Sequence, residues 1–83
     1  MVFKEKEVIE LSGGKKYIVA KSINQDDCWY YGLFEVNKEE TEVRTELRII
    51  TTVSENGNIF IKNVKGKLAE ELEIVFKEKL NID

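Results

Sequence analysis

The chain has 83 residues, of which 42% are hydrophobic and 35% are charged. This is the length of one small soluble domain, whose core is too modest to surround a deep catalytic cavity. Thirteen Lys and Arg residues against sixteen Asp and Glu residues give a net charge of -3, which provides no general attraction to polyanions. With no His and a single cysteine, Cys28, the chain cannot form His-based catalytic triads, internal disulfides or four-cysteine zinc sites.

The cellular location of the protein is predicted from the length and position of its hydrophobic segments. No apolar run approaches the ~18 residues that are needed to cross a bilayer. Acidic residues at Glu5 and Glu7 occupy the region where a secretory signal would need its hydrophobic stretch. We therefore expect a cytoplasmic protein that does not contact membranes.

Most of the chain alternates β-branched or aromatic residues with polar ones, which is typical of strands with one buried face. Short Gly, Asn and Asp clusters interrupt this alternation at spacings that suit hairpins, and Asn56-Gly57 is the strongest of these turn signals. Five strands are predicted, at about residues 7–11, 16–23, 28–36, 42–53 and 59–64.

The last part of the chain changes to a period of about 3.6 residues, which predicts a helix over residues 67–80. Its apolar stripe comprises Leu68, Leu72, Val75, Phe76 and Leu80, and Gly66 is the expected cap. At roughly 1.5–3 kcal/mol for each buried side chain, this stripe should dock the helix on the sheet. The predicted fold is a single α+β domain over residues 1–83. It is an antiparallel meander of five strands, curved or partly closed, with an SH3-like barrel as one such form, and with the C-terminal helix packed on the sheet.

The third predicted strand is the most aromatic segment. On a strand, Trp29 and Tyr31 share one face and Tyr30 and Phe34 share the other, so a domain with one helix has difficulty burying both faces equally. If a curved sheet does bury both, these residues are core. If one face is exposed, Trp29 and Tyr31 form a recognition surface, because aromatic side chains dominate binding hot spots.

Two arginines of the fourth predicted strand, Arg44 and Arg48, are placed by alternation on one face with Glu46 between them. Ion pairing on a solvated face explains this ladder without any function. If it borders the aromatic residues, Arg44 and Arg48 could bind an anionic group. We include both arginines, with Trp29 and Tyr31, as candidate binding residues.

No catalytic residue, metal site or cofactor is predicted. Cys28 follows two aspartates that oppose thiolate formation, so we expect a packed or half-buried thiol rather than a nucleophile. The acidic turns at residues 26–27 and 39–42 lack the alternating spacing and central Gly of a calcium loop. Solvated turns are the simpler interpretation.

Several segments together resemble small uncharacterised proteins of low-GC Gram-positive bacteria and their mobile elements. The resemblance is carried by Lys6-Glu7-Val8-Ile9-Glu10-Leu11, by Gly14-Lys15-Lys16-Tyr17-Ile18-Val19, by Trp29-Tyr30-Tyr31 and by the closing amphipathic helix. It spans most of the chain as a pattern of strands, acidic turn and helix. It implies no particular activity.

The leading hypothesis for function is a non-catalytic binding or regulatory module for a protein partner. A single-stranded nucleic-acid-binding barrel is the alternative, although the acidic balance argues against a nucleic-acid partner. A further alternative is an inhibitor or antitoxin of a mobile element, which would present Asp26, Asp27, Glu39 and Glu40 to a basic enzyme site. The open ends of the meander leave two assemblies possible, a monomer or a homodimer paired through edge strands.

Overall fold

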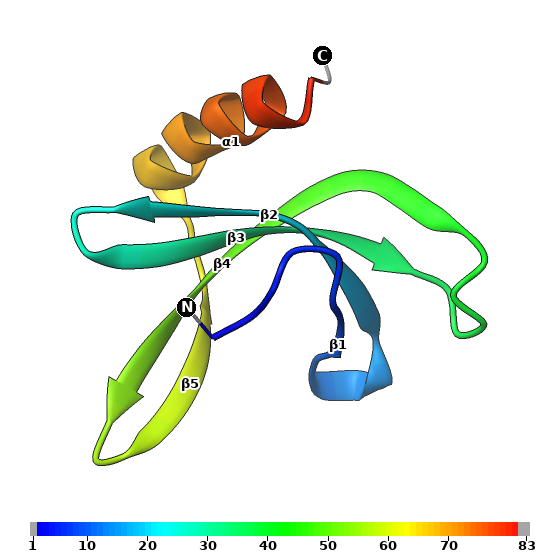
Figure 1. Cartoon of the computed structure of the whole chain (residues 1–83), viewed down its shortest axis with the longest axis horizontal. Coiled ribbons are helices and arrows are strands. Elements are labelled where there is room, and N and C mark those ends of the chain that lie inside the picture. Colours follow the sequence, from blue (N-terminus) through cyan, green and yellow to red (C-terminus); the bar gives the residue numbers. More distant parts are fainter. Residues whose placement is uncertain (1, 82–83) are drawn as a thin grey trace.

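The computed structural model describes residues 2–81. The elements in chain order are β1 (Val8–Glu10), a short 3-10 turn (Ser12–Gly14), β2 (Lys16–Gln25), β3 (Cys28–Val36), β4 (Val43–Glu55), β5 (Asn58–Asn63) and α1 (Gly66–Leu80). The five strands form one antiparallel sheet in the order β1-β2-β3-β4-β5, which curls into a half-barrel with α1 on its outer side (Figure 1). The α+β meander expected from the sequence is therefore confirmed. Within the described residues, no helix has the length and apolar character needed to cross a membrane.

The hairpin turns use backbone conformations that few residues adopt. Asn56 and Gly57 both have positive φ, 50° and 81°, as the expected type I′ turn requires. Asp26 and Asp27 also have positive φ, 53° and 63°, so the β2–β3 turn has the same form without a glycine. As a result β2 and β4 each extend two residues further than predicted, to Gln25 and to Glu55.

A bulge in β2 divides the apolar residues between the two faces of the sheet. The pairing of β2 with β3 shifts register between Val19 and Lys21, which leaves Ala20 as the extra residue. Simple alternation would place Val19 and Ile23 on one face. The bulge instead sends Val19 into the concave face and Ile23 to the outer face, under the helix.

The outer face and α1 form one of two hydrophobic clusters. Leu72 and Phe76 of the helix pack with Ile23 and Ile49 of the sheet, and Leu68 and Val75 border them as the predicted stripe requires. Ile74, off the stripe, is 62% exposed. The helix begins at Gly66, so the capping position is Lys65 rather than the expected Gly66, and Lys65 makes no side-chain capping bond.

The concave face holds the second cluster, which is covered by the N-terminal residues. Its buried members are Ile9, Tyr17, Val19, Tyr31, Leu33 and Ile50. Phe3 lies across them, with its ring centroid 5.1 Å from that of Tyr31 in an edge-on contact. The backbone N–H of Val2 donates to the Tyr31 hydroxyl at 2.9 Å, so residues 2–7 form an arm that closes one side of this core.

The arm is fastened to β2 by Glu5, which makes its attachment depend on pH. The Glu5 carboxylate accepts hydrogen bonds from the Ser22 backbone N–H at 3.0 Å and lies 3.7 Å from the Lys21 ammonium. The Ser22 N–H bond, aided by Lys21, holds the pKa of Glu5 below its ordinary value of 4.5. A lowered pKa contributes stability that is present above the unfolded-state value and is lost as the pH falls through the folded-state value.

We therefore expect the arm to loosen selectively in acid, at pH values below about 4.5. The Ser22 amide should then move in a two-dimensional NMR titration, and Glu5→Gln should abolish that titration step. A Ser22 amide that titrates equally in the Glu5→Gln variant would show that another carboxyl group controls the arm.

Candidate functional site

The structure removes Tyr31 from the surface that the sequence suggested. Tyr31 is 0% exposed in the concave cluster, and its hydroxyl is engaged by Val2. The opposite face of β3 is also covered, because Gly32 lies directly beneath the ring of Phe76 in α1. The curled sheet thus buries both faces of the aromatic strand, and the interpretation of Tyr31 as an exposed binding residue is wrong.

Trp29 lies on the same face of β3 as Tyr31, near the start of the strand, and remains partly accessible to solvent. It packs against the rim of the concave cluster, and its carbonyl accepts a hydrogen bond from the Thr51 hydroxyl at 2.8 Å. The next residue of β4, Thr52, pairs with Ile61 of β5. Trp29 therefore lies where β3 approaches the β4–β5 hairpin, not beside the arginines with which the sequence analysis grouped it.

Arg48 projects from the concave face of β4, where it is held by two residues that sequence reasoning missed. Its Nη1 donates to the Tyr17 hydroxyl at 2.8 Å, and the guanidinium lies 5.0 Å from the centroid of the Tyr17 ring. Nε and Nη2 both donate to the Asn63 side-chain oxygen, at 3.0 and 2.7 Å. Arg48 thus connects β2, β4 and β5 at the centre of the curl, with its guanidinium in a fixed orientation.

Arg44 and Arg48 both line one open cavity of about 400 Å³ beside the N-terminal half of β4. The strict alternation that would place both arginines on one face of β4 is interrupted between them. The register of the β3–β4 pairing shifts there, so that the segment Val43 to Leu47 of β4 lies opposite the shorter segment Phe34 to Val36 of β3. Three carboxylates also line this cavity, those of Glu35, Glu46 and Glu73. Since the acidic side chains outnumber the two arginines, the cavity offers no net attraction to an anion.

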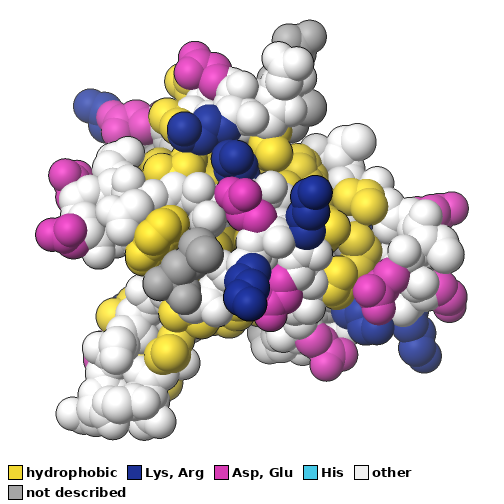
Figure 2. Space-filling view, in the orientation of Figure 1, with side chains coloured by type: hydrophobic (Ala, Val, Ile, Leu, Met, Phe, Trp, Pro, Cys, Tyr) yellow, Lys and Arg dark blue, Asp and Glu magenta, His cyan; other side chains and the backbone are white. Residues whose placement is uncertain are grey.

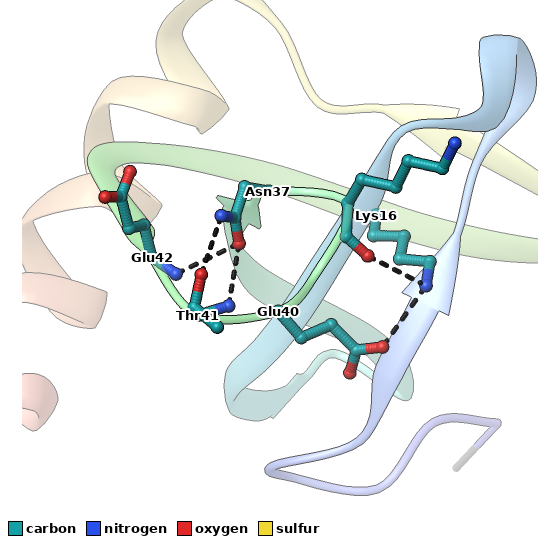
Figure 3. A network of polar contacts seen from close by, with 6 residues as sticks. Lys16, Asn37, Glu40, Thr41 and Glu42 are labelled. Carbon is teal, nitrogen blue, oxygen red and sulfur yellow. Dashed lines mark hydrogen bonds and ion pairs between the residues drawn. The ribbon is translucent and has the colours of Figure 1, made fainter.

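The acidic turns lie at opposite ends of β3. Residues 26–27 form the β2–β3 turn, whereas Glu39 and Glu40 lie in the β3–β4 loop, and the nine residues of β3 between them span roughly 30 Å. In that loop Asn37 accepts the backbone N–H groups of Thr41 and Glu42, while Glu40 pairs with Lys16 at 3.2 Å (Figure 3). These acidic residues do not form one surface.

The most exposed continuous apolar segment is β5, which the sequence analysis treated only as a strand. Ile59, Phe60 and Ile61 are 55%, 48% and 42% exposed. Figure 2 shows hydrophobic side chains along the β4–β5 hairpin, which extends to the lower left of the molecule. Other exposed apolar residues, such as Val43 and Ile74, are isolated in sequence, and single exposed apolar residues are ordinary.

The outer edge of β5 also presents free backbone groups. The Val64 N–H donates to the Ile49 carbonyl at 3.1 Å, and the hairpin pairing continues from there to Glu55 and Asn58 at the turn. Bonded pairs alternate along an antiparallel ladder, so Phe60 and Lys62 direct their backbone groups toward β4. Ile59, Ile61 and Asn63 direct theirs outward, where no strand of the described sheet lies.

A groove runs between this edge and β1. Its volume is about 380 Å³, and both edges of the sheet contribute to it together with one residue of β4. The lining residues are Glu10, Leu11, Ser12, Arg48, Ile59, Phe60, Ile61 and Asn63. We call it the β1–β5 groove.

The groups with shifted pKa values lie away from both cavities. Burial, together with the neighbouring Cys28, raises the pKa of Tyr30 above its ordinary value, yet neither Tyr30 nor Glu5 lines either cavity. Cys28 itself is exposed at the β2–β3 turn, so the expectation of a packed thiol was wrong. It is the first residue of β3, directly after the turn at residues 26–27.

No family model, curated protein or solved structure matches the chain. Functional inference therefore depends on the geometry of the molecule.

Proposed function

We propose that this protein is a non-catalytic module that binds a protein partner through the outer edge of β5. The observation that carries the proposal is the run Ile59-Phe60-Ile61, 42–55% exposed on a strand with one unpaired edge. Proteins generally protect sheet edges with charged residues, Pro, bulges or very short strands. β5 has six residues, no Pro and a single charge, Lys62.

The opposite edge of the sheet provides an internal comparison. β1 has only three residues, the buried Ile9 and its exposed neighbours Val8 and Glu10. Its short length therefore protects β1 from pairing with another chain. β5 is longer and carries too little charge to discourage such pairing. This difference supports β5 as the edge that a partner occupies.

Strand addition is the binding mode that suits this edge. The outward N–H and C=O groups of Ile59, Ile61 and Asn63 would supply the hydrogen bonds of a new ladder, and the exposed apolar side chains would add specificity. Trp29, close to Thr51 and Thr52 on the neighbouring strand, extends the apolar area toward β3. Backbone pairing of this kind needs no catalytic group.

We expect Ile61→Pro to prevent partner binding while preserving the fold. The N–H of Ile61 points outward, so Pro removes a donor from the partner's ladder without removing a β4–β5 hydrogen bond, and Pro is tolerated in this way on edge strands. Recovery of bound partners from a lysate of the native host, quantified by mass spectrometry, should fall roughly tenfold or more.

Ile61→Thr is the matched control, because it removes a similar amount of apolar side chain but keeps the backbone donor. Circular dichroism melting should show that both variants are folded. Equal recovery of partners by the wild-type, Ile61→Pro and Ile61→Thr proteins would refute docking at the β5 edge.

A further inference from the structure

The β1–β5 groove lies between the two unpaired ends of the sheet, because β1 and β5 do not pair with each other. Each of the four strand pairs is antiparallel, so β1 and β5 run in the same sense at the two ends of the curl. A strand placed between them and antiparallel to both would continue the alternation and close a barrel. Figure 1 shows the two edges on either side of the opening.

Both edges turn backbone groups toward that opening. Residues Ile59, Ile61 and Asn63 do so on β5, as described above. On β1, Val19 donates to the Glu7 carbonyl and Leu11 donates to the Lys15 carbonyl, so alternation leaves the backbone groups of Val8 and Glu10 facing outward. An entering strand would therefore meet donors and acceptors on each side.

The side chains of the groove define what an entering strand must carry. Ile59, Ile61 and Leu11 offer apolar contact, whereas Arg48 offers charge. Arg48 has five N–H donors and uses three of them on Tyr17 and Asn63, which leaves two for a ligand. A guanidinium held in a fixed orientation is well suited to a carboxylate.

Glu10 is the other charged residue of the groove, on the β1 side. It makes the groove neutral overall, so a strand that carries many acidic residues would be repelled as well as attracted. One carboxylate, placed opposite Arg48, would pair with the guanidinium without lying close to the carboxylate of Glu10. The remaining inward positions should be apolar.

We propose that the β1–β5 groove binds an extended segment of a partner protein, antiparallel to β1 and β5, with apolar residues at alternate positions and one Asp or Glu facing Arg48. The inference rests on the proposed function and specifies the chemistry of the partner. Charge decides against a second copy of this chain that enters with its own β5, because that strand would bring Lys62 and no carboxylate to Arg48.

The probe is a set of fluorescein-labelled nonapeptides that alternate Thr and Val, with Lys at both ends for solubility. One inward Val is replaced in turn by Glu, Gln or Lys, and Kd is measured by fluorescence anisotropy. At one inward position we expect the Glu peptide to bind at least tenfold more tightly than the Gln peptide, and the Lys peptide to bind least. Because this comparison uses the unmodified protein, it does not depend on the stability of any variant.

Variants of the protein then locate the carboxylate. Arg48→Gln should remove the preference for Glu over Gln, and Arg48→Lys should retain only part of it, since an ammonium lacks the planar fork. Ile61→Pro should weaken all of the peptides, and Ile61→Thr should weaken them much less. Melting curves would identify any loss of fold in the Arg48 variants.

Failure of this inference is distinguishable from failure of the proposed function. Equal Kd values for the Glu and Gln peptides, or no peptide binding at millimolar concentration, would overturn the inference, whereas the proposed function would stand if Ile61→Pro still lost its cellular partner. Recovery of partners that is unaffected by Ile61→Pro would overturn the proposed function. A dimer in analytical ultracentrifugation that Ile61→Pro converts to a monomer, and that the peptides do not displace, would assign the edge to a second copy and overturn the inference.

Discussion

Replacing Phe76 by Ala is expected to lower the free energy of unfolding by about 3–5 kcal/mol. Phe76 is 0% exposed and is the largest side chain that α1 contributes to the core. Its ring lies over Gly32, the one position of β3 without a side chain, so Gly32 has no side chain that could fill the space that Ala would leave. Because a domain of this kind has about 5–15 kcal/mol of stability in total, the loss should be plain in urea denaturation.

Two further variants make this prediction specific to the contact between Phe76 and Gly32. A Cβ added at Gly32 would lie 2.9 Å from Phe76 Cδ1, and Gly32 lacks a positive φ, so Gly32→Ala should destabilise by steric overlap alone, by about 1–3 kcal/mol. Ile74→Ala, on the exposed side of the same helix, should change stability by no more than about 0.5 kcal/mol. A cost for Phe76→Ala as small as that for Ile74→Ala would mean that α1 does not stabilise the sheet.

Replacing Tyr31 by Ala is expected to destabilise the fold rather than to weaken a surface interaction. Tyr31 is completely buried between Phe3 and the rest of the concave cluster, and removal of a buried aromatic ring costs about 3–5 kcal/mol. The loss should appear as a lower midpoint of urea denaturation. Any loss of partner binding should follow the unfolded fraction.

Tyr31→Phe tests the contribution of the hydroxyl group separately from that of the ring. This variant keeps the ring and gives up only the bond from Val2, so it should lose about 0.5–1.5 kcal/mol and leave the arm less firmly attached. Trp29→Ala, at the accessible rim, should destabilise less than Tyr31→Ala. A Tyr31→Ala protein that is fully folded but no longer binds its partner would restore the exposed-aromatic interpretation.

The sequence predicted the strands and the helix because local patterns specify them. Asn56-Gly57 defines one turn, and the stripe of Leu72 and Phe76 defines the buried side of α1. The bulge at Ala20 was not predictable, because Ala has no distinctive preference for such a position and the alternation on either side of it is regular. Because the bulge was not predictable, the sequence alone could not place Ile23 on the outer face of the sheet, under α1.

The candidate site was predicted less well, for a geometric reason. Arg48 was a candidate from the sequence, but its contact with Tyr17 joins β2 to β4 across the intervening β3. Such a contact depends on the curl of the sheet, which no local pattern encodes. The exposure of β5 was missed, although the strand itself was predicted, because three consecutive apolar residues carry no alternation and do not distinguish a buried central strand from an exposed edge.

The meander order has a consequence for how the chain acquires its structure. Each strand pairs with the next one in sequence, so the sheet can grow hairpin by hairpin through contacts of short sequence separation, which favours rapid folding. The helix α1, in contrast, must reach back past β3 to contact β2. During synthesis, every strand leaves the ribosome before the helix does, and the outer face of the sheet stays bare until α1 arrives to cover it.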